Sequence, residues 1–194
     1  MFSLAPVEFR RSEIEGRGVF AKRAIAPGET IVPYAPKHAR LAVDDPRATA
    51  AAATRLTVLA PDGFVLVPDE GSPGGWLCNH SCAPNATLVT SGTPRIRCLR
   101  PVARGEEITI FYGWVTENGE GSMPCRCGAE TCRGTIDFTV TDEDAAAVRV
   151  VDGELATTDP RVREKLEEYA EFLHSIGQEH VQRAIATKLA HMRG

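Results

Sequence analysis

The 194-residue sequence lacks the features that mark membrane, secreted and nucleic-acid-binding proteins. No apolar run approaches the ~18 residues of a membrane span, and residues 1–13 carry charges where a signal peptide needs an apolar core. The net charge is −4, which excludes a general electrostatic binder of nucleic acids. We therefore expect an intracellular, cytoplasmic protein with no membrane or direct nucleic-acid partner. If the source is eukaryotic, or if the protein is delivered into a host cell, we expect it in the nucleus.

The remaining composition is that of an ordinary globular protein. Hydrophobic residues make up 43% and charged residues 25%, and no internal repeat or low-complexity segment occurs. The length favours one domain with an extension. Six cysteines in a reducing compartment point to metal binding or chemistry before disulfides.

Short β-branched runs separated by turn signals cover the first 112 residues and predict a mainly β body with some α. An alanine-rich stretch, 41–56, predicts a short helix. Pro61-Asp62-Gly63 predicts a hairpin turn between strands at 57–59 and 64–67. The other expected strands are 19–21, 25–32, 96–99 and 107–112.

The composition changes after residue 141. Residues 142–194 hold eleven acidic side chains against seven basic ones, so this segment carries the whole net charge. Asp159 can cap a helix that has Pro160 in its first position, and Gly177 is a natural stop. A C-terminal α-helical hairpin is expected, packed on its own domain or forming a homodimer, because apolar residues recur at helical spacing: Val162, Leu166, Tyr169, Leu173 and Ile176, then Val181, Ala184, Ile185, Leu189 and Met192.

Three cysteines lie within eight residues: Cys125, Cys127 and Cys132. Three thiols this close can face one point, and zinc binds four ligands in a tetrahedron. The fourth ligand would come from Cys78, Cys82, Cys98 or one of the five histidines. The alternative, that all are small buried hydrophobic residues, fits a lone cysteine such as Cys98 better than a cluster in a polar, glycine-rich stretch.

A second unusual segment is Asn79-His80-Ser81-Cys82-Ala83-Pro84-Asn85, which directly follows the apolar Trp76-Leu77-Cys78. Short polar side chains in such density usually specify a loop through hydrogen bonds to the backbone. Further along, the expected strand from Glu107 runs into the aromatic residues Phe111 and Tyr112. Taken alone, His80 and Tyr112 each fit an ordinary core residue with a bonded polar group.

The order of these segments resembles that of the SET-domain protein lysine methyltransferases with a post-SET zinc segment. Gly16-Arg17-Gly18 comes first, then 79–85, then Gly105-Glu106-Glu107-Ile108-Thr109 with Tyr112, and then the cysteine cluster. The resemblance covers about two-thirds of the chain, from Arg10 to Thr135. It implies a β-rich pseudoknot fold, in which the Asn-His-Ser segment threads under a loop beside the tyrosine strand. The expected parts are a SET domain at 1–121, a post-SET segment at 122–140 and a helical extension at 141–194.

The resemblance also implies a reaction, which is transfer of methyl groups from S-adenosylmethionine to the ε-amine of lysine. The substrate would be a protein or peptide, such as a histone, a histone-like protein or another basic protein. Catalysis is assigned to Tyr112, with Tyr34 lining the lysine channel. The implied cofactor-binding residues are Arg17, Gly18, Asn79, His80 and Tyr112. One structural zinc ion per chain would be held by Cys82, Cys125, Cys127 and Cys132, leaving Cys78 and Cys98 in the core.

The sequence departs from the family at two positions. Phe111 stands where the family often has Asp, and Ile110 where many members carry the Phe or Tyr that limits the number of methyl groups added. Two other functions are alternatives. An inactive SET module that binds a partner should have lost Tyr112 or the Asn79–His80 pair, and both are present. A zinc-knuckle nucleic-acid binder needs a basic, aromatic surface, which the balanced charge of residues 1–141 argues against.

Overall fold

The computed structural model describes residues 5–42, 44–52, 57–59, 64–90, 92–112, 122–137, 147–151 and 154–175. The chain divides into two compact units, which are treated separately below. The first unit comprises residues 1–111 with 126–132, and the second comprises 112–125 with 133–194. Across the described ranges, no helix has both the length and the apolar character needed to cross a membrane.

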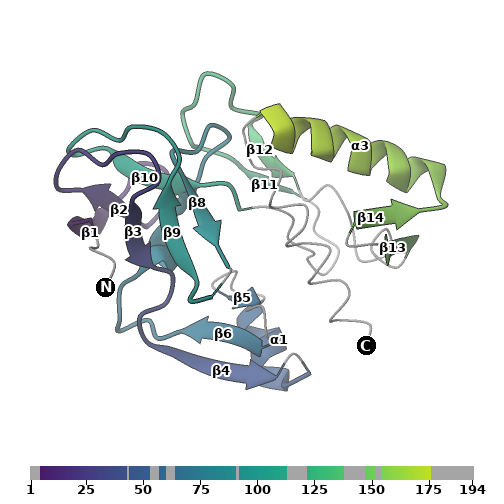
Figure 1. Ribbon diagram of the computed structural model, residues 1–194, viewed down its shortest axis with the longest axis horizontal. Coiled ribbons are helices and arrows are strands. Elements are labelled where there is room, and N and C mark those ends of the chain that lie inside the picture. Colours follow the sequence, from purple (N-terminus) through teal and green to yellow (C-terminus); the bar gives the residue numbers. More distant parts are fainter. Residues whose placement is uncertain are drawn as a thin grey trace. The chain divides into compact units, whose positions relative to one another are not determined.

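The first unit is built mainly from short strands (Figure 1). They form three sheets with the orders β1-β2-β10-β7, β3-β9-β8 and β4-β6-β5. A helix, α1 (Pro46–Ala52), and a 3₁₀ turn, η1 (Gly75–Leu77), complete it. The strands are β1 (Val7–Arg11), β2 (Arg17–Ala21), β3 (Thr30–Pro33), β4 (His38–Ala42), β5 (Val58–Leu59), β6 (Phe64–Pro68), β7 (Asn79–His80), β8 (Ala86–Val89), β9 (Arg95–Cys98) and β10 (Glu107–Ile110).

The prediction of a mainly β body is confirmed, and the predicted short helix and strand pair are present. The alanine-rich stretch contains α1, although its first two residues end β4. β5 and β6 pair antiparallel as the expected hairpin, while the turn between them lies outside the described residues. β-Branched residues fill the core, where Val19, Ile31, Ile96 and Ile108 are fully buried.

The pairing of β7 with β10 is parallel, unlike the other strand pairs of this sheet. Thr109 lies opposite Asn79, and Ile110 lies opposite His80. A parallel pair cannot be closed by a tight turn, so the chain between them makes an excursion through β8 and β9 before it returns. The segment that follows β7 therefore runs beside β10 rather than away from it, and the Ser81 N–H donates to the Ile110 carbonyl at 2.9 Å.

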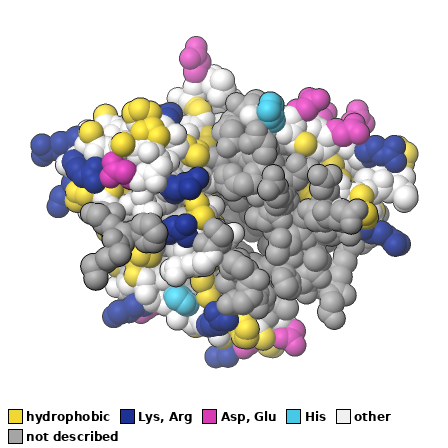
Figure 2. Space-filling model, in the orientation of Figure 1, with side chains coloured by type: hydrophobic (Ala, Val, Ile, Leu, Met, Phe, Trp, Pro, Cys, Tyr) yellow, Lys and Arg dark blue, Asp and Glu magenta, His cyan; other side chains and the backbone are white. Residues whose placement is uncertain are grey.

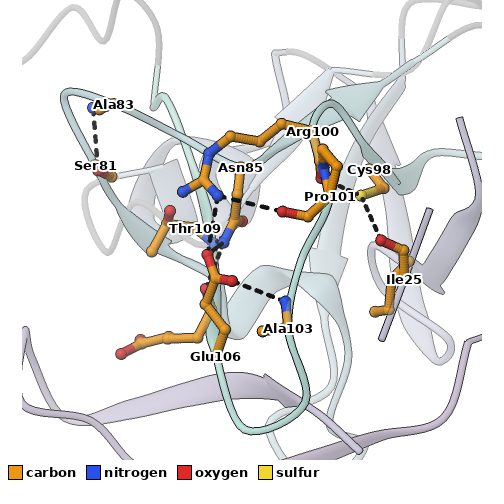
Figure 3. Close-up of polar contacts among 11 residues, drawn as sticks. Ile25, Ser81, Ala83, Asn85, Cys98, Arg100, Pro101, Ala103, Glu106 and Thr109 are labelled. Carbon is orange, nitrogen blue, oxygen red and sulfur yellow. Dashed lines mark hydrogen bonds and ion pairs between the residues drawn. The ribbon is translucent and has the colours of Figure 1, made fainter. Parts of the chain in front are cut away.

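Asn85 fastens the far end of this threaded segment to β10 (Figure 3). Its side chain is 1% exposed, and its Oδ1 accepts a hydrogen bond from the Thr109 N–H at 2.9 Å. Its Nδ2 donates to the Glu107 carbonyl at 2.7 Å and to Glu106 Oε1 at 3.0 Å. Both ends of segment 81–85 are thus tied to one strand, which agrees with the expected pseudoknot.

Glu106 links this fastening to the turn before β10 (Figure 3). Its carboxylate accepts from the Ala103 N–H at 2.9 Å and from the Arg100 guanidinium at 3.1 Å. Burial acts to raise the pKa of Glu106, but the hydrogen bonds from Ala103 and Asn85 and the charge of Arg100 outweigh it and hold the pKa below its usual value. Glu106 is therefore charged at neutral pH.

The second unit contains two short antiparallel pairs and a long helix. The strands β11 (Ser122–Pro124) and β12 (Thr135–Asp137) form one pair, and β13 (Val148–Val151) and β14 (Glu154–Thr157) form the other. The helix α3 (Pro160–Ser175) lies against β14.

The start of α3 is as expected, with Pro160 first and Asp159 as the cap. The Asp159 carboxylate accepts from the Arg161 N–H at 2.9 Å. Val162 and Leu166 on the predicted apolar stripe are buried. The second helix expected over 181–192, and the stop at Gly177, lie outside the described residues, so the hairpin and the homodimer stay predictions.

Candidate functional site

Asn79 joins three parts of the first unit through its side-chain amide. Its Nδ2 donates to the carbonyl oxygens of Glu15 at 3.1 Å and Arg17 at 3.3 Å, and to Glu107 Oε1 at 2.8 Å. The glycine turn around Arg17, the strand β7 and the strand β10 therefore meet at one carboxamide. This contact brings together Asn79, Arg17 and Gly18, three of the residues predicted to bind the cofactor.

Glu107 completes this network from β10. Its second carboxylate oxygen, Oε2, accepts from the Ser12 hydroxyl at 2.8 Å, and Ser12 Oγ in turn accepts from the Ile14 N–H at 2.9 Å. Gly18 has no side chain where the carboxylate lies, and a Cβ there would overlap Glu107 Oε1. A larger residue at position 18 would therefore displace the carboxylate from its contacts with Asn79 and Ser12.

The two polar atoms of the Asn79 amide differ in their hydrogen bonding. Nδ2 has three acceptors, whereas Oδ1 accepts no hydrogen bond from the described residues. The residue is only 7% exposed, so this oxygen is a buried acceptor without a donor in the described part of the chain. Leaving such a group unpaired costs about 1–3 kcal/mol. S-adenosylmethionine carries an ammonium group that could supply the donor, and in this respect the residues present fit that cofactor.

His80 lies beside Asn79 with its ring buried, at 3% exposure. The ring centroid is 5.3 Å from that of Phe111, with the planes tilted by 54°. Its Nε2 lies 3.6 Å from the Sγ of Cys82. Burial lowers the pKa of His80 to about 4, so the imidazole is neutral at pH 7.

Cys82, Cys125, Cys127 and Cys132 form a cluster, as predicted. Their four sulfur atoms all lie within 4.8 Å of one another. Zn–S bonds of ~2.3 Å in a tetrahedron place the sulfurs about 3.8 Å apart, so small movements suffice to close on an ion. The Cys82 N–H also points to the Cys127 sulfur at 3.5 Å. A set of four thiols fits zinc in donor type, number and spacing.

The two other cysteines, Cys78 and Cys98, are both 2% exposed and lie outside that cluster, as the prediction of core positions requires. Burial, together with the negative charge of Glu107, raises the pKa of the Cys78 thiol. Burial also raises the pKa of Cys98, whose thiol donates to the Arg100 carbonyl at 2.9 Å (Figure 3). Both thiols therefore stay protonated and unreactive at neutral pH.

The two tyrosines assigned to catalysis follow strand ends. Tyr112 is half-buried and comes two residues after β10, next to Phe111. Tyr34 follows β3 directly and is 6% exposed. The Tyr34 carbonyl accepts from the Trp76 N–H at 2.9 Å, so Tyr34 lies against η1, just before β7. Their catalytic roles stay predictions.

Sequence reasoning assigned no function to Ser12, Asn85 or Glu107. Glu107 belongs to the Gly105-Glu106-Glu107 motif, which leads into the strand before Tyr112. The motif does not indicate which groups the Glu107 carboxylate binds. Its partners lie in the neighbouring strand β7, 28 residues away in sequence, and in a turn 95 residues away, so only the folded chain shows them.

Comparison with known proteins points in the same direction. A family model described as the SET domain matches residues 16–113. Histone-lysine N-methyltransferase 2B of Homo sapiens is 33% identical over 132 residues, 63% of this chain and 5% of that protein. Histone-lysine N-methyltransferase set-2 of Caenorhabditis elegans is 34% identical over 140 residues, 68% of this chain and 9% of that protein.

A third relative, from Yarrowia lipolytica, is named histone-lysine N-methyltransferase, H3 lysine-4 specific. It is 32% identical over 141 residues, 68% of this chain and 12% of that protein. The chain thus spans a small fraction of the length of the curated relatives it matches. The matched segment includes the whole Asn79 network apart from Ser12, Ile14 and Glu15, and it ends directly after Tyr112.

Proposed function

Because the chain belongs to the SET domain family, we propose that it is an S-adenosylmethionine-dependent protein-lysine N-methyltransferase. The observation that supports this most directly is the buried carboxamide of Asn79. It holds the glycine turn and β10 together through Nδ2, and its Oδ1 is left as an acceptor. A site built only for stability would satisfy both halves of a buried amide.

The cofactor-binding residues in this proposal are Arg17, Gly18, Asn79, His80 and Tyr112. When bound, S-adenosylmethionine supplies an activated methyl group, so the protein needs mainly to place the two reactants. Asn79 Oδ1 would accept from the ammonium of the cofactor. The neutral, buried His80 keeps β7 in place by its contacts with Phe111 and Cys82. Holding reactants in one geometry can lower a barrier by several kcal/mol.

The lysine side of the reaction is assigned to Tyr112 and Tyr34. The Tyr112 hydroxyl would orient the lysine amine, and Tyr34 would line the channel that admits it. The amine must be neutral to act as a nucleophile, and a desolvated channel favours loss of its proton. The residues of the family motifs include no dedicated base, so we assign the proton to solvent.

The four clustered cysteines are proposed to hold one structural zinc ion. Four thiolates leave no open coordination position for water, so this metal would not act in the reaction. Its effect would be to join Cys82, in the segment threaded beside β10, to the Cys125–Cys132 stretch. In this division residues 1–121 form the SET domain, 122–140 the post-SET segment and 141–194 the helical extension.

The substrate class proposed is a basic, lysine-containing protein, for which a histone or a histone-like protein is the model. The relatives are named for histone lysine, and the acidic C-terminal segment of this chain favours a basic partner. Figure 2 shows acidic side chains gathered over α3, where the exposed residues include Glu164, Glu167, Glu168 and Glu171. Such a surface raises the association rate of a cationic substrate at low salt.

Two measurements test the proposal. Calorimetry with S-adenosylmethionine should show binding, which a zinc knuckle would not. Incubation with a cell lysate and with purified histones, read by mass spectrometry, should show methylated lysine, which an inactive module would not produce. Cofactor binding without any methylation of either mixture would favour the inactive module.

A further inference from the structure

We propose that Glu107 is a positioning residue for the cofactor, which acts by fixing the orientation of the Asn79 carboxamide. This inference rests on the proposed function, since it concerns the same binding segment. Its basis is that the carboxylate of Glu107 lies 2.8 Å from Asn79 Nδ2 and 2.8 Å from Ser12 Oγ. One side chain thus holds both the strand β7 and the turn that precedes β2.

The chemistry of its partners determines which way the amide of Asn79 points. The three groups around its Nδ2 are the Glu15 carbonyl, the Arg17 carbonyl and the Glu107 carboxylate. None of these can donate a hydrogen bond when the carboxylate is ionised. Rotating the amide by 180° would bring Oδ1 against three oxygen acceptors. Only one orientation is therefore compatible with the surroundings, and it presents Oδ1 to the remaining side.

Glu107 makes the largest contribution to this preference. The Asn79 amide group has two hydrogens for three acceptors. Its contacts with the Glu15 and Arg17 carbonyls are long, at 3.1 and 3.3 Å, whereas its contact with the Glu107 carboxylate is 2.8 Å and involves a charge. The glycine at position 18 leaves free the space that the carboxylate occupies, which a side chain there would take. The fold keeps a partly buried carboxylate at this point although burial of a charge is costly.

The consequence is that cofactor affinity should depend on Glu107 even though Glu107 need not touch the cofactor. Without the carboxylate, the amide of Asn79 can rotate and place Nδ2 where an acceptor is needed. The ammonium of the cofactor would then face a donor. The methyl-transfer step itself should be little affected once the cofactor is bound, because Glu107 makes no contact with the reacting atoms in this proposal.

The test compares Glu107→Ala with Glu106→Gln by calorimetry with S-adenosylmethionine and by steady-state kinetics. Glu107→Ala is expected to raise the Kd and the KM for the cofactor about tenfold, with kcat at saturating cofactor within about threefold of the parent. Glu107→Gln should recover most of the affinity, because its carbonyl oxygen can accept from Asn79. The control, Glu106→Gln, removes the neighbouring charge that binds Asn85 and Arg100, and it should leave the cofactor Kd unchanged.

A double-mutant cycle separates action through Asn79 from a general loss of structure. In an Asn79→Ala background, Glu107→Ala should cause no further loss of cofactor affinity, since no amide remains to be oriented. Additive losses, or an equal loss in Glu106→Gln, would overturn the inference, as would an unchanged Kd in folded Glu107→Ala. If the parent chain itself binds no S-adenosylmethionine, the proposed function fails, and this inference fails with it.

A second variant serves if Glu107→Ala does not fold. Glu107→Met keeps the length and bulk of the side chain but removes the oxygens that accept from Asn79, so it should weaken cofactor binding about tenfold, as Glu107→Ala does. Unchanged cofactor affinity in folded Glu107→Met would contradict the orienting role.

Discussion

Replacing Asn85 by alanine should loosen the threaded segment from β10 and lower the free energy of unfolding by about 3–4 kcal/mol. The magnitude follows from three side-chain hydrogen bonds, to the Thr109 N–H, the Glu107 carbonyl and the Glu106 carboxylate. Two are neutral bonds worth about 1 kcal/mol each, and the third, to a charged group, is worth about 1.5 kcal/mol or more. The side chain is 1% exposed, so water cannot replace the lost partners without opening the strand.

The assay is urea unfolding at pH 7, followed by circular dichroism. A fall in the midpoint at constant slope would report a loss of stability rather than a change in the unfolded state. Arg104→Ala, at an exposed position in the turn before β10, is the matched control and should change stability by less than about 0.5 kcal/mol. A loss below about 1 kcal/mol in Asn85→Ala would refute the view that this amide fastens the segment.

Asn85→Asp tests the same contact through pH. The new carboxylate keeps an acceptor for Thr109 but faces the Glu106 carboxylate and the Glu107 carbonyl, so its pKa in the folded state is raised. A raised folded pKa means that the native state binds the proton more tightly than the unfolded state. Relative to the parent, the variant should therefore become more stable as the pH falls from 7 towards about 4, the usual value for aspartate. A stability difference that does not change with pH would contradict this.

The other predictions concern the reaction, the metal and assembly. Tyr112→Phe removes the hydroxyl but keeps the ring, so it should reduce kcat about 10²–10³-fold while cofactor affinity hardly changes; wild-type turnover would make this tyrosine a core residue. Metal analysis should find one zinc per chain. Cys132→Ser should lose the zinc and weaken cofactor binding, while the control Cys98→Ser should keep it. Active protein without metal would disprove the site. Ile110 stands where many family members carry a bulky Phe or Tyr, so mass spectrometry should find more than one methyl group per lysine. Product that stays monomethylated at long times would refute this. Light scattering should show a dimer that is lost when the chain ends at residue 141; a monomer at micromolar concentration would indicate intramolecular packing.

Signals confined to a few neighbouring residues were sufficient to predict several elements. Asp159 and Pro160 define the start of α3 because a cap and a first-turn proline act within one turn. The hairpin of β13 and β14 was not predicted. The dipeptide Asp152-Gly153 stands between the two strand sequences, and Asp-Gly in such a place is a strong hairpin signal. This two-residue signal stands in an acidic segment whose apolar residues recur mainly at helical spacing, which favours helices.

Signals that depend on distant residues could not be read from the chain alone. Spacing gave three of the clustered cysteines but left the fourth open, and only the resemblance selected Cys82. The structure brings Cys82 to the other three because Asn85 and Ser81 tie its loop to β10. Glu107 is a similar case, since its partners Ser12 and Asn79 come from segments far from it in sequence. Contacts of this kind are set by the topology of the sheet.

That topology has a consequence for the synthesis of the protein. β2 lies between β1 and β10, so the hairpin of β1 and β2 can form early, but its second edge stays open until residues 107–110 have left the ribosome. At ~5–20 residues per second, the wait between Phe20 and its partner Glu107 is roughly 5–20 s. During this time Val19 and Phe20, buried in the folded chain, are exposed on an unpaired strand. The nascent chain is therefore most prone to aggregate before β10 emerges, and a chaperone that covers the N-terminal hairpin should raise the yield of folded protein.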